Sequence, residues 1–263
     1  MKYWTILFAC FWGFSLFGQS PFSVEPMAGV SLTRLQPSGE LSDILVTPSN
    51  RINVSYGLRI NYDLSPKVFL SGGVHYLRKG SDYSDVTVPD EFLSILTGGF
   101  GLGNININDF VDATAQVQIN YLNAPVTVGY RLKANDKLSF FAETGGYFSY
   151  GLSGKTGGAL TSEFPLLSSF LDPDEQAGEG EISFDNDFSR IDFGWLAGGG
   201  IAWYGFTLSF QYGLGLHNTV GNFNDAFFGT VPQEAQDVFE QIDVESRTFN
   251  RFFVGRLGYR ITF

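Results

Sequence analysis

One stretch of the chain, residues 51–63, reads RINVSYGLRINYD. Every second residue from Ile52 to Tyr62 is apolar, and the residues between them are polar or glycine. This period of two is that of a β-strand with two different faces, and it does not fit a helix. Residues 206–217 and 249–263 alternate in the same way. These runs, of 12 to 15 residues, are longer than a typical strand of a soluble sheet and can cross a bilayer when tilted.

Weaker alternation predicts five further strands, at residues 22–34, 68–79, 116–132, 138–153 and 190–204. In the third of these the apolar phase slips between Tyr121 and Leu122, which predicts a β-bulge there. The connections alternate between short turns and long segments, and the long ones are residues 35–50, 80–115, 154–189 and 218–246. An even number of strands with this alternation is typical of outer-membrane barrels. The sequence therefore predicts a transmembrane antiparallel up-and-down β-barrel of about eight strands.

The composition agrees with a membrane barrel. The 263 residues include 27 Phe, 12 Tyr and 32 Gly, and only 16% are charged, against about a quarter in a typical soluble domain. The mean hydropathy is nevertheless close to zero, which fits strands with one apolar face better than apolar helices. A soluble β-sandwich is the alternative fold, but it does not need apolar residues on its outer faces.

The N-terminus predicts export. Lys2 precedes an apolar run from Trp4 to Phe17, which has the length of a signal-peptide core. We expect residues 1–19 to form a signal peptide that is cleaved, and residues 20–263 to form the barrel domain in the outer membrane of a Gram-negative cell. A short membrane anchor is the alternative, although the run is shorter than the ~20 apolar residues of a spanning helix. Cys10 lies within the run, so the mature chain is expected to contain no thiol.

Charge is distributed unevenly along the chain. Of the 27 acidic residues, 22 fall in the four long segments, together with one base, Lys155. These acidic outer loops are also expected to hold short helices, at Pro89–Leu96, Phe164–Leu171 and Pro232–Ile242. Basic residues gather where strands reach the outer side, and we name this set the basic girdle: Arg34, Arg51, Arg78, Lys79, Arg190, Arg247 and Arg251.

The basic girdle has two interpretations. A ring of bases at this height can bind the phosphates of outer-membrane lipopolysaccharide through charge-assisted hydrogen bonds. The alternative is that these residues are ordinary solvated strand ends. A net charge of −11 argues against nucleic acid as a partner.

The same alternation points several charged side chains into the barrel. An eight-stranded barrel is narrow enough for side chains to fill it, and charges buried there must be paired. We therefore predict a structural ion-pair network inside the barrel that consists of Glu25, Arg59, Glu143, Arg256 and Arg260. A proton or ion path is the alternative role for these residues.

No catalytic residues, cofactor or metal ligands are predicted. His75 is expected to face the lumen near Ser71 and Ser81, and His217 lies at the outer rim. Catalysis needs a nucleophile and an orienting acid within reach of a His, and the spacing shows neither. The acidic runs 172–175 and 185–187 offer oxygen ligands for a cation, but they lack the spacing of an EF-hand.

Four short motifs resemble a known family. They are Tyr76-Leu77-Arg78-Lys79-Gly80, Tyr121-Leu122-Asn123-Ala124-Pro125-Val126, Asp192-Phe193-Gly194 with Gly198-Gly199-Gly200, and Tyr212-Gly213-Leu214. Their order is similar to Y-x-x-K-G, Y-L-E-I-P-L, D-x-G-x-x-x-G-x-G and Y-x-x-G-L of the PorT-type outer-membrane β-barrel family. Asn123 stands where that family has Glu, and the last motif is one residue shorter. The resemblance implies an outer-membrane barrel and, through the member that gives the family its name, a link to a secretion system.

Two functions are open at this point. The first is a non-enzymatic outer-membrane protein that is structural or binds a partner through its extracellular loops, with an accessory role in an envelope or secretion machine. The second is a narrow pore or transporter of small solutes.

Overall fold

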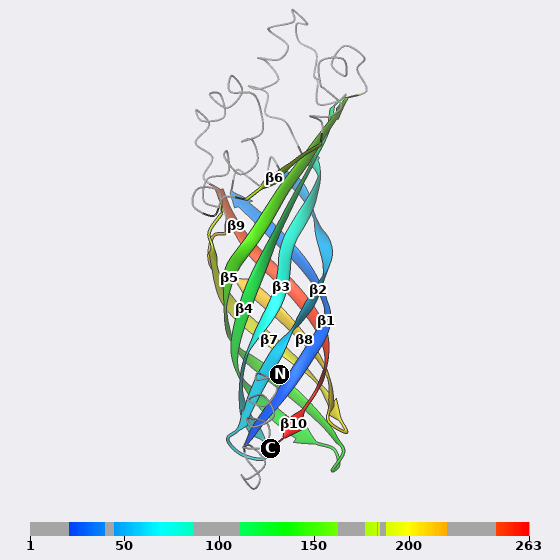
Figure 1. Cartoon of the computed structure of the whole chain (residues 1–263), viewed down its shortest axis with the longest axis vertical. Helices are drawn as coiled ribbons and strands as arrows, with labels where there is room; N and C mark the ends of the chain where they lie inside the picture. The colour runs from blue at the N-terminus through cyan, green and yellow to red at the C-terminus, as the bar shows by residue number, and fades with distance from the viewer. Residues whose placement is uncertain are drawn as a thin grey trace, which may run out of the picture.

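The computed structural model describes residues 21–39, 45–86, 111–162, 177–182, 184, 188–219 and 246–262. They form one antiparallel sheet that closes into a barrel (Figure 1). Its strands are β1 (Phe22–Gly39), β2 (Leu45–Asp63), β3 (Val68–Val86), β4 (Val111–Lys133), β5 (Leu138–Ser162), β6 (Ala177–Glu181), β7 (Ile191–Trp203), β8 (Phe206–Gly215), β9 (Ser246–Tyr259) and β10 (Ile261–Thr262).

The barrel wall consists of eight strands. β10 continues β9, and both pair with β1, which closes the barrel. β6 lies outside this path and pairs with the outer part of β5. The predicted eight-stranded antiparallel barrel is therefore confirmed. No helix in the described part of the chain has the length and hydrophobicity to cross a membrane.

The outer surface of the wall is apolar over most of its height. The side chains predicted to face lipid are all exposed: Leu58, Ile60, Phe210, Tyr212, Leu257 and Tyr259. The residues between them in sequence point inward. In β8, for example, exposed and buried side chains alternate at every position from Phe206 to Tyr212. Exposed apolar side chains on all eight strands thus form a continuous band around the barrel, which suits contact with lipid chains.

A charge placed in this band should destabilise the barrel. Phe210 is 45% exposed and lies near the middle of the apolar face of β8, between Phe206 at the periplasmic turn and Leu216, so Phe210→Arg should lower the free energy of unfolding by roughly 2–4 kcal/mol. Leu216→Arg, just beyond the outer end of β8, is the matched control and should change it by about 0–1 kcal/mol. Urea unfolding in lipid vesicles measures both. Equal stabilities for wild type and Phe210→Arg would show that the assigned face does not contact lipid.

The strands extend further on the outer side than the sequence predicts. β3 ends at Val86 rather than Lys79, and β5 at Ser162 rather than Ser153. Polar residues and glycine dominate these extensions, so they lack the apolar alternation from which strands were predicted. The backbone hydrogen bonds between strands nevertheless continue through them. The predicted signal peptide (1–19), the three predicted loop helices and Phe263 lie outside the described residues.

A β-bulge occurs close to the predicted place but on the neighbouring strand. The β4–β5 register shifts between Asn120 and Tyr121, which pair with Ser153 and Gly151. Leu152 of β5 is therefore the extra residue. β4 itself alternates regularly through this region, with Ile119, Tyr121 and Asn123 all buried. The change in sequence pattern at Tyr121 reflects a change in the side chains that fill the interior, from apolar (Val117, Ile119) to polar (Asn123, Thr127), and not a slip of β4.

β1 crosses the outer mouth of the barrel. Its ladder with β2 ends at Thr33, opposite Arg51. Beyond this point β1 contacts β3 instead: Gly80 N donates to Thr33 Oγ1 (3.1 Å), and Leu35 N donates to Ser81 Oγ (2.8 Å). Leu35 is 1% exposed. The outer end of the barrel is therefore flattened and filled by side chains of its own wall.

The opposite end carries the short turns. The β7–β8 hairpin turns on Tyr204 and Gly205, which both have positive φ (51° and 86°), as tight hairpins with a two-residue turn require. Tyr204 N donates to Lys137 O (3.0 Å), which links this turn to the β4–β5 turn. Because outer-membrane barrels have short periplasmic turns, this end is the periplasmic one.

Candidate functional site: the barrel interior and outer rim

Glu143 of β5 is the centre of a buried polar network in the periplasmic half of the lumen. Its Oε2 accepts hydrogen bonds from Arg59 Nη2 (2.6 Å) and Thr127 Oγ1 (3.0 Å). Its Oε1 accepts one from Gln211 Nε2 (2.8 Å), and Gln211 Oε1 in turn accepts one from Arg256 Nη1 (2.5 Å). The carboxylate thus contacts Arg59 directly and Arg256 through one amide.

The network continues toward the periplasm. Arg59 Nε donates to Asn61 Oδ1 (3.0 Å), and Asn61 Nδ2 donates to Glu25 Oε2 (3.3 Å). Arg260 Nη2 lies 3.9 Å from the same Glu25 oxygen. The structure therefore brings all five residues of the predicted network into one continuous chain. The neutral residues that connect them, Asn61 and Gln211, were not predicted, because alternation gives the direction of a side chain but not its height relative to other strands.

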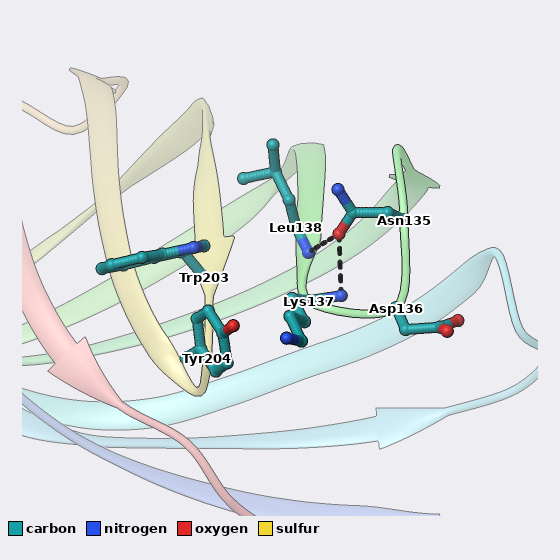
Figure 2. A pocket seen from close by; sticks show the side chains of 6 residues that line it. All are labelled: Asn135, Asp136, Lys137, Leu138, Trp203 and Tyr204. Carbon is teal, nitrogen blue, oxygen red and sulfur yellow. Dashed lines mark hydrogen bonds between the residues drawn. The ribbon is translucent and has the colours of Figure 1, made fainter.

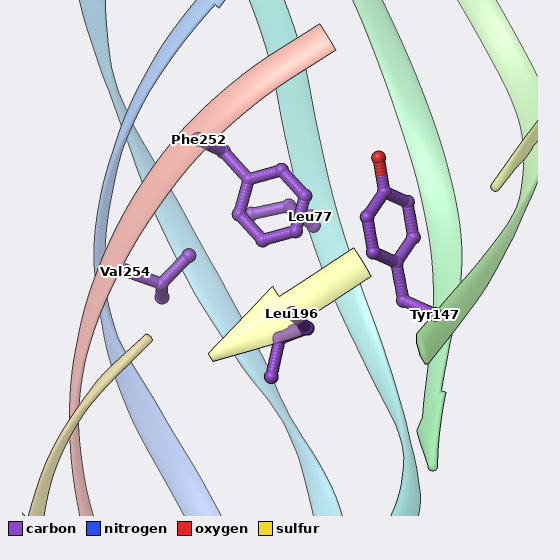
Figure 3. Close-up of a cluster of buried hydrophobic side chains, with 5 residues drawn as sticks. All are labelled: Leu77, Tyr147, Leu196, Phe252 and Val254. Carbon is purple, nitrogen blue, oxygen red and sulfur yellow. The ribbon is translucent and has the colours of Figure 1, made fainter. Parts of the chain in front are cut away.

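An apolar layer lies above this network. Leu77, Tyr147, Leu196, Phe252 and Val254 pack together across the lumen (Figure 3). The rings of Tyr147 and Phe252 meet edge to face at 5.1 Å. Phe252 needs glycine at position 213, where a Cβ would lie 2.1 Å from its ring. This layer separates the Glu143 network from the outer half of the lumen.

A second buried ion pair lies above the apolar layer. Lys79 Nζ is 2.6 Å from Asp192 Oδ2, and both side chains are at most 1% exposed. The ammonium also lies over three aromatic rings, with centroid distances of 4.9 Å to Tyr121, 4.4 Å to Tyr147 and 4.7 Å to Phe252. Such cation–π contacts favour a charged lysine in a place without water.

Lys79 was predicted in the basic girdle, and this prediction is wrong. It shares the inward phase of His75, four residues earlier in β3, and both are buried. The alternation of β3 places Lys79 on the inner face of the strand, whereas the clustering of bases at strand ends suggested the outer rim. Lys79 and Asp192 come from two of the four sequence motifs, and Asn123 of a third accepts a hydrogen bond from Ser149 Oγ (2.7 Å) beside them.

The other girdle residues lie on the outer wall above the apolar band. Arg190, Arg247 and Arg251 are exposed, and Arg34, Arg51 and Arg78 are half-exposed. Arg51 has a polar partner on the neighbouring strand β3, and Arg78 has one on its own strand. Arg51 Nη1 is 2.8 Å from Asp82 Oδ1, and Arg78 Nε donates to Tyr76 Oη (3.1 Å).

The two histidines occupy different environments. His75 is buried in the lumen and 1% exposed. His217 Nε2 lies 3.1 Å from Ser189 Oγ, and its ring stacks on Phe193 at 5.2 Å. The sequence did not predict this His–Ser contact. Among the described acids, Asp192 is the nearest to Ser189 in sequence, but its side chain is buried in the lumen and binds Lys79, on the other side of the wall.

A shallow hollow of about 390 Å³ lies between two periplasmic turns. Figure 2 shows Lys137 beside Tyr204, with the ammonium 4.9 Å from the ring centroid. Asn135 Oδ1 caps the turn by accepting from Lys137 N and Leu138 N. These contacts stabilise the turn, and they give the hollow no arrangement of groups suited to catalysis.

Among the described residues, no three His, Cys, Asp or Glu side chains are placed to hold a metal ion. The acidic runs 172–175 and 185–187 lie outside that part of the chain.

Residues 17–221 match the family described as outer membrane protein beta-barrel domain. The chain belongs to this family. It is an outer-membrane β-barrel protein whose strands cross the membrane, as the apolar outer band requires. No curated protein is detectably similar in sequence.

Several solved structures of outer-membrane proteins share a weak likeness with this barrel. Ail of Yersinia pestis is 10% identical, with 91% of this chain and 98% of that chain covered and a TM-score of 0.32. Neisserial surface protein A is 11% identical (94% and 100% covered, TM-score 0.36). The protease OmpT of Escherichia coli is 9% identical (94% and 99% covered, TM-score 0.31). Similarities of this size say nothing about what this chain does.

Proposed function

We propose that this protein is a non-enzymatic, plugged barrel that presents its acidic outer segments to an envelope partner. The observation that carries the proposal is the filled lumen. Two buried ion-pair layers enclose an apolar layer, and β1 crosses the outer mouth, so the described wall leaves no path for a solute. Partner binding is then assigned to the outer segments, where 22 of the 27 acidic residues lie.

We also propose that the protein has no enzymatic activity. Ser189 and His217 have a distance suited to nucleophile and base. However, Ser189 Oγ also donates to Ile191 O (2.9 Å) and accepts from Ile191 N (3.2 Å). These bonds tie the hydroxyl into the backbone of its own loop. Within the described residues, His217 has no carboxylate to orient it.

The resemblance to the PorT-type family suggests the kind of partner. Lys79, Asn123 and Asp192, from three of the shared motifs, meet in one buried cluster, so the motifs serve the interior of the barrel. On this basis the protein has an accessory role in an envelope or secretion machine, and partner specificity lies in the outer segments.

The test has two arms. Affinity purification from native outer membranes should recover a partner with the wild-type barrel, and the partner should be lost when residues 163–176 or 220–245 are replaced by Gly-Ser linkers. Single-channel recording in planar bilayers should show no steady conductance for wild type. Retention of every co-purifying protein by both replaced variants would contradict partner binding. A steady conductance would support the alternative, a narrow pore for small solutes.

A further inference from the structure

Arg34 and Arg251 lie directly opposite each other on the outer wall. They are partners in the β1–β9 ladder. The pair one step toward the periplasm on the same face is Leu32 and Phe253, which are 41% and 43% exposed. The two arginines therefore stand immediately above the last lipid-facing pair of this seam.

Within the part of the chain that the structure describes, no carboxylate compensates this arginine pair. Opposite residues in an antiparallel ladder have Cβ atoms ≈ 4.5–5.5 Å apart, and like charges at such positions destabilise the sheet. No acidic side chain of the described residues forms an ion pair with either arginine, whereas Arg51 nearby has Asp82. Arg34 Nε is also buried and lacks a hydrogen-bond partner. An unsatisfied donor on one of two arginines that face each other in a ladder favours an anion bound between them.

The neighbouring strand indicates where the anion comes from. Across the β8–β9 ladder, Arg251 pairs with Leu214, and Leu216 beyond it is 59% exposed. Apolar side chains thus reach the height of the arginines on this side. An anion that contacts both guanidinium groups approaches from the membrane boundary, where lipid phosphates lie. In the outer leaflet of an outer membrane these belong to lipopolysaccharide.

We infer that Arg34 and Arg251 form a clamp for one phosphate group of lipid A. Each planar guanidinium can donate two parallel hydrogen bonds to a phosphate, so two facing arginines neutralise the anion that separates them. The clamp lies on the lipid side of the wall. It is independent of the proposed partner binding by the outer segments and of the filled lumen.

Titration of bisphosphorylated lipid A into the purified barrel in maltoside detergent, followed by native mass spectrometry, tests the clamp. Arg34→Gln and Arg251→Gln should each lower the affinity at least tenfold. The double variant should be little worse than either single variant, because the phosphate needs both residues. Arg190→Gln is the matched control, since Arg190 is exposed and lies over Tyr150 and Phe184, and it should stay within twofold of wild type.

Several results would overturn the clamp. They are wild-type affinity in the double variant, an equal loss in the Arg190 control, or unchanged binding of dephosphorylated lipid A. Binding of inorganic phosphate as tight as that of lipid A would make this a free-anion site and remove the lipid assignment. Folding provides a second measurement. Without lipid, each single variant should unfold at the same or a higher urea concentration than wild type, because the repulsion is relieved, and a lower midpoint would count against an uncompensated pair.

Discussion

Glu143→Gln should destabilise the barrel by about 3–5 kcal/mol, the range for removing one partner of a buried ion pair. The carboxylate is the only acid in direct contact with Arg59 among the described residues, and it also orients Gln211 toward Arg256. Its loss leaves two buried guanidinium groups that repel each other. Urea unfolding in detergent or lipid vesicles, followed by tryptophan fluorescence, measures the change.

A second substitution should recover much of this loss. Glu143→Gln with Arg59→Met removes both charges of the direct pair, and such replacements can be nearly neutral. Arg256→Met should recover less, because Arg256 reaches Glu143 only through Gln211. Asp136→Asn, in an exposed turn, is the control and should stay within about 0.5 kcal/mol of wild type. Strict additivity of Glu143→Gln and Arg59→Met would disprove the network and leave Glu143 available for a functional role.

The outer ion pair should show an effect of similar size. Lys79→Met keeps most of the side-chain volume but leaves the Asp192 carboxylate buried with only Asn250 Nδ2 (2.9 Å) and Tyr147 Oη (3.3 Å) as donors. We expect a loss of about 3–5 kcal/mol. The same urea titration should show partial recovery in the double variant Lys79→Met with Asp192→Asn.

The control for this pair is Lys67→Met, which removes an exposed base from a periplasmic turn and should have little effect. If Lys79→Met were as stable as Lys67→Met, the burial of Asp192 would not require a cation, and the three aromatic rings around Lys79 would have another purpose. A double variant less stable than both single variants would also contradict the pairing.

Alternation of side chains allowed most of the wall to be predicted. It gave the strand number, the lipid-facing residues such as Leu58 and Phe210, and the inward direction of Arg59, Glu143 and Arg256. These features depend only on local period two and on the need to pair charges in a narrow lumen.

Features that depend on contacts between distant strands were not predicted. Arg51 was expected in the girdle, and its ion pair with Asp82 follows from a register shift between β2 and β3 that no local pattern shows. Leu152 became the bulged residue although the pattern change was in β4. The pairing of Lys79 with Asp192 joins β3 to β7 across the lumen, and sequence spacing gives no height for either.

The unequal lengths of the strands give the cell-surface end a tall side and a short side. Beyond Leu152, whose apolar side chain is exposed, β5 continues for ten residues to Ser162. At ~3.3 Å per residue and a tilt of ~40°, this raises the end of β5 by roughly 25 Å. By contrast, β8 ends at Gly215, directly before the exposed apolar side chain of Leu216. The described wall is therefore higher at β3–β5 than at β8, so a label attached at the outer end of β5 would stand farther from the lipid phosphates than one at Gly215.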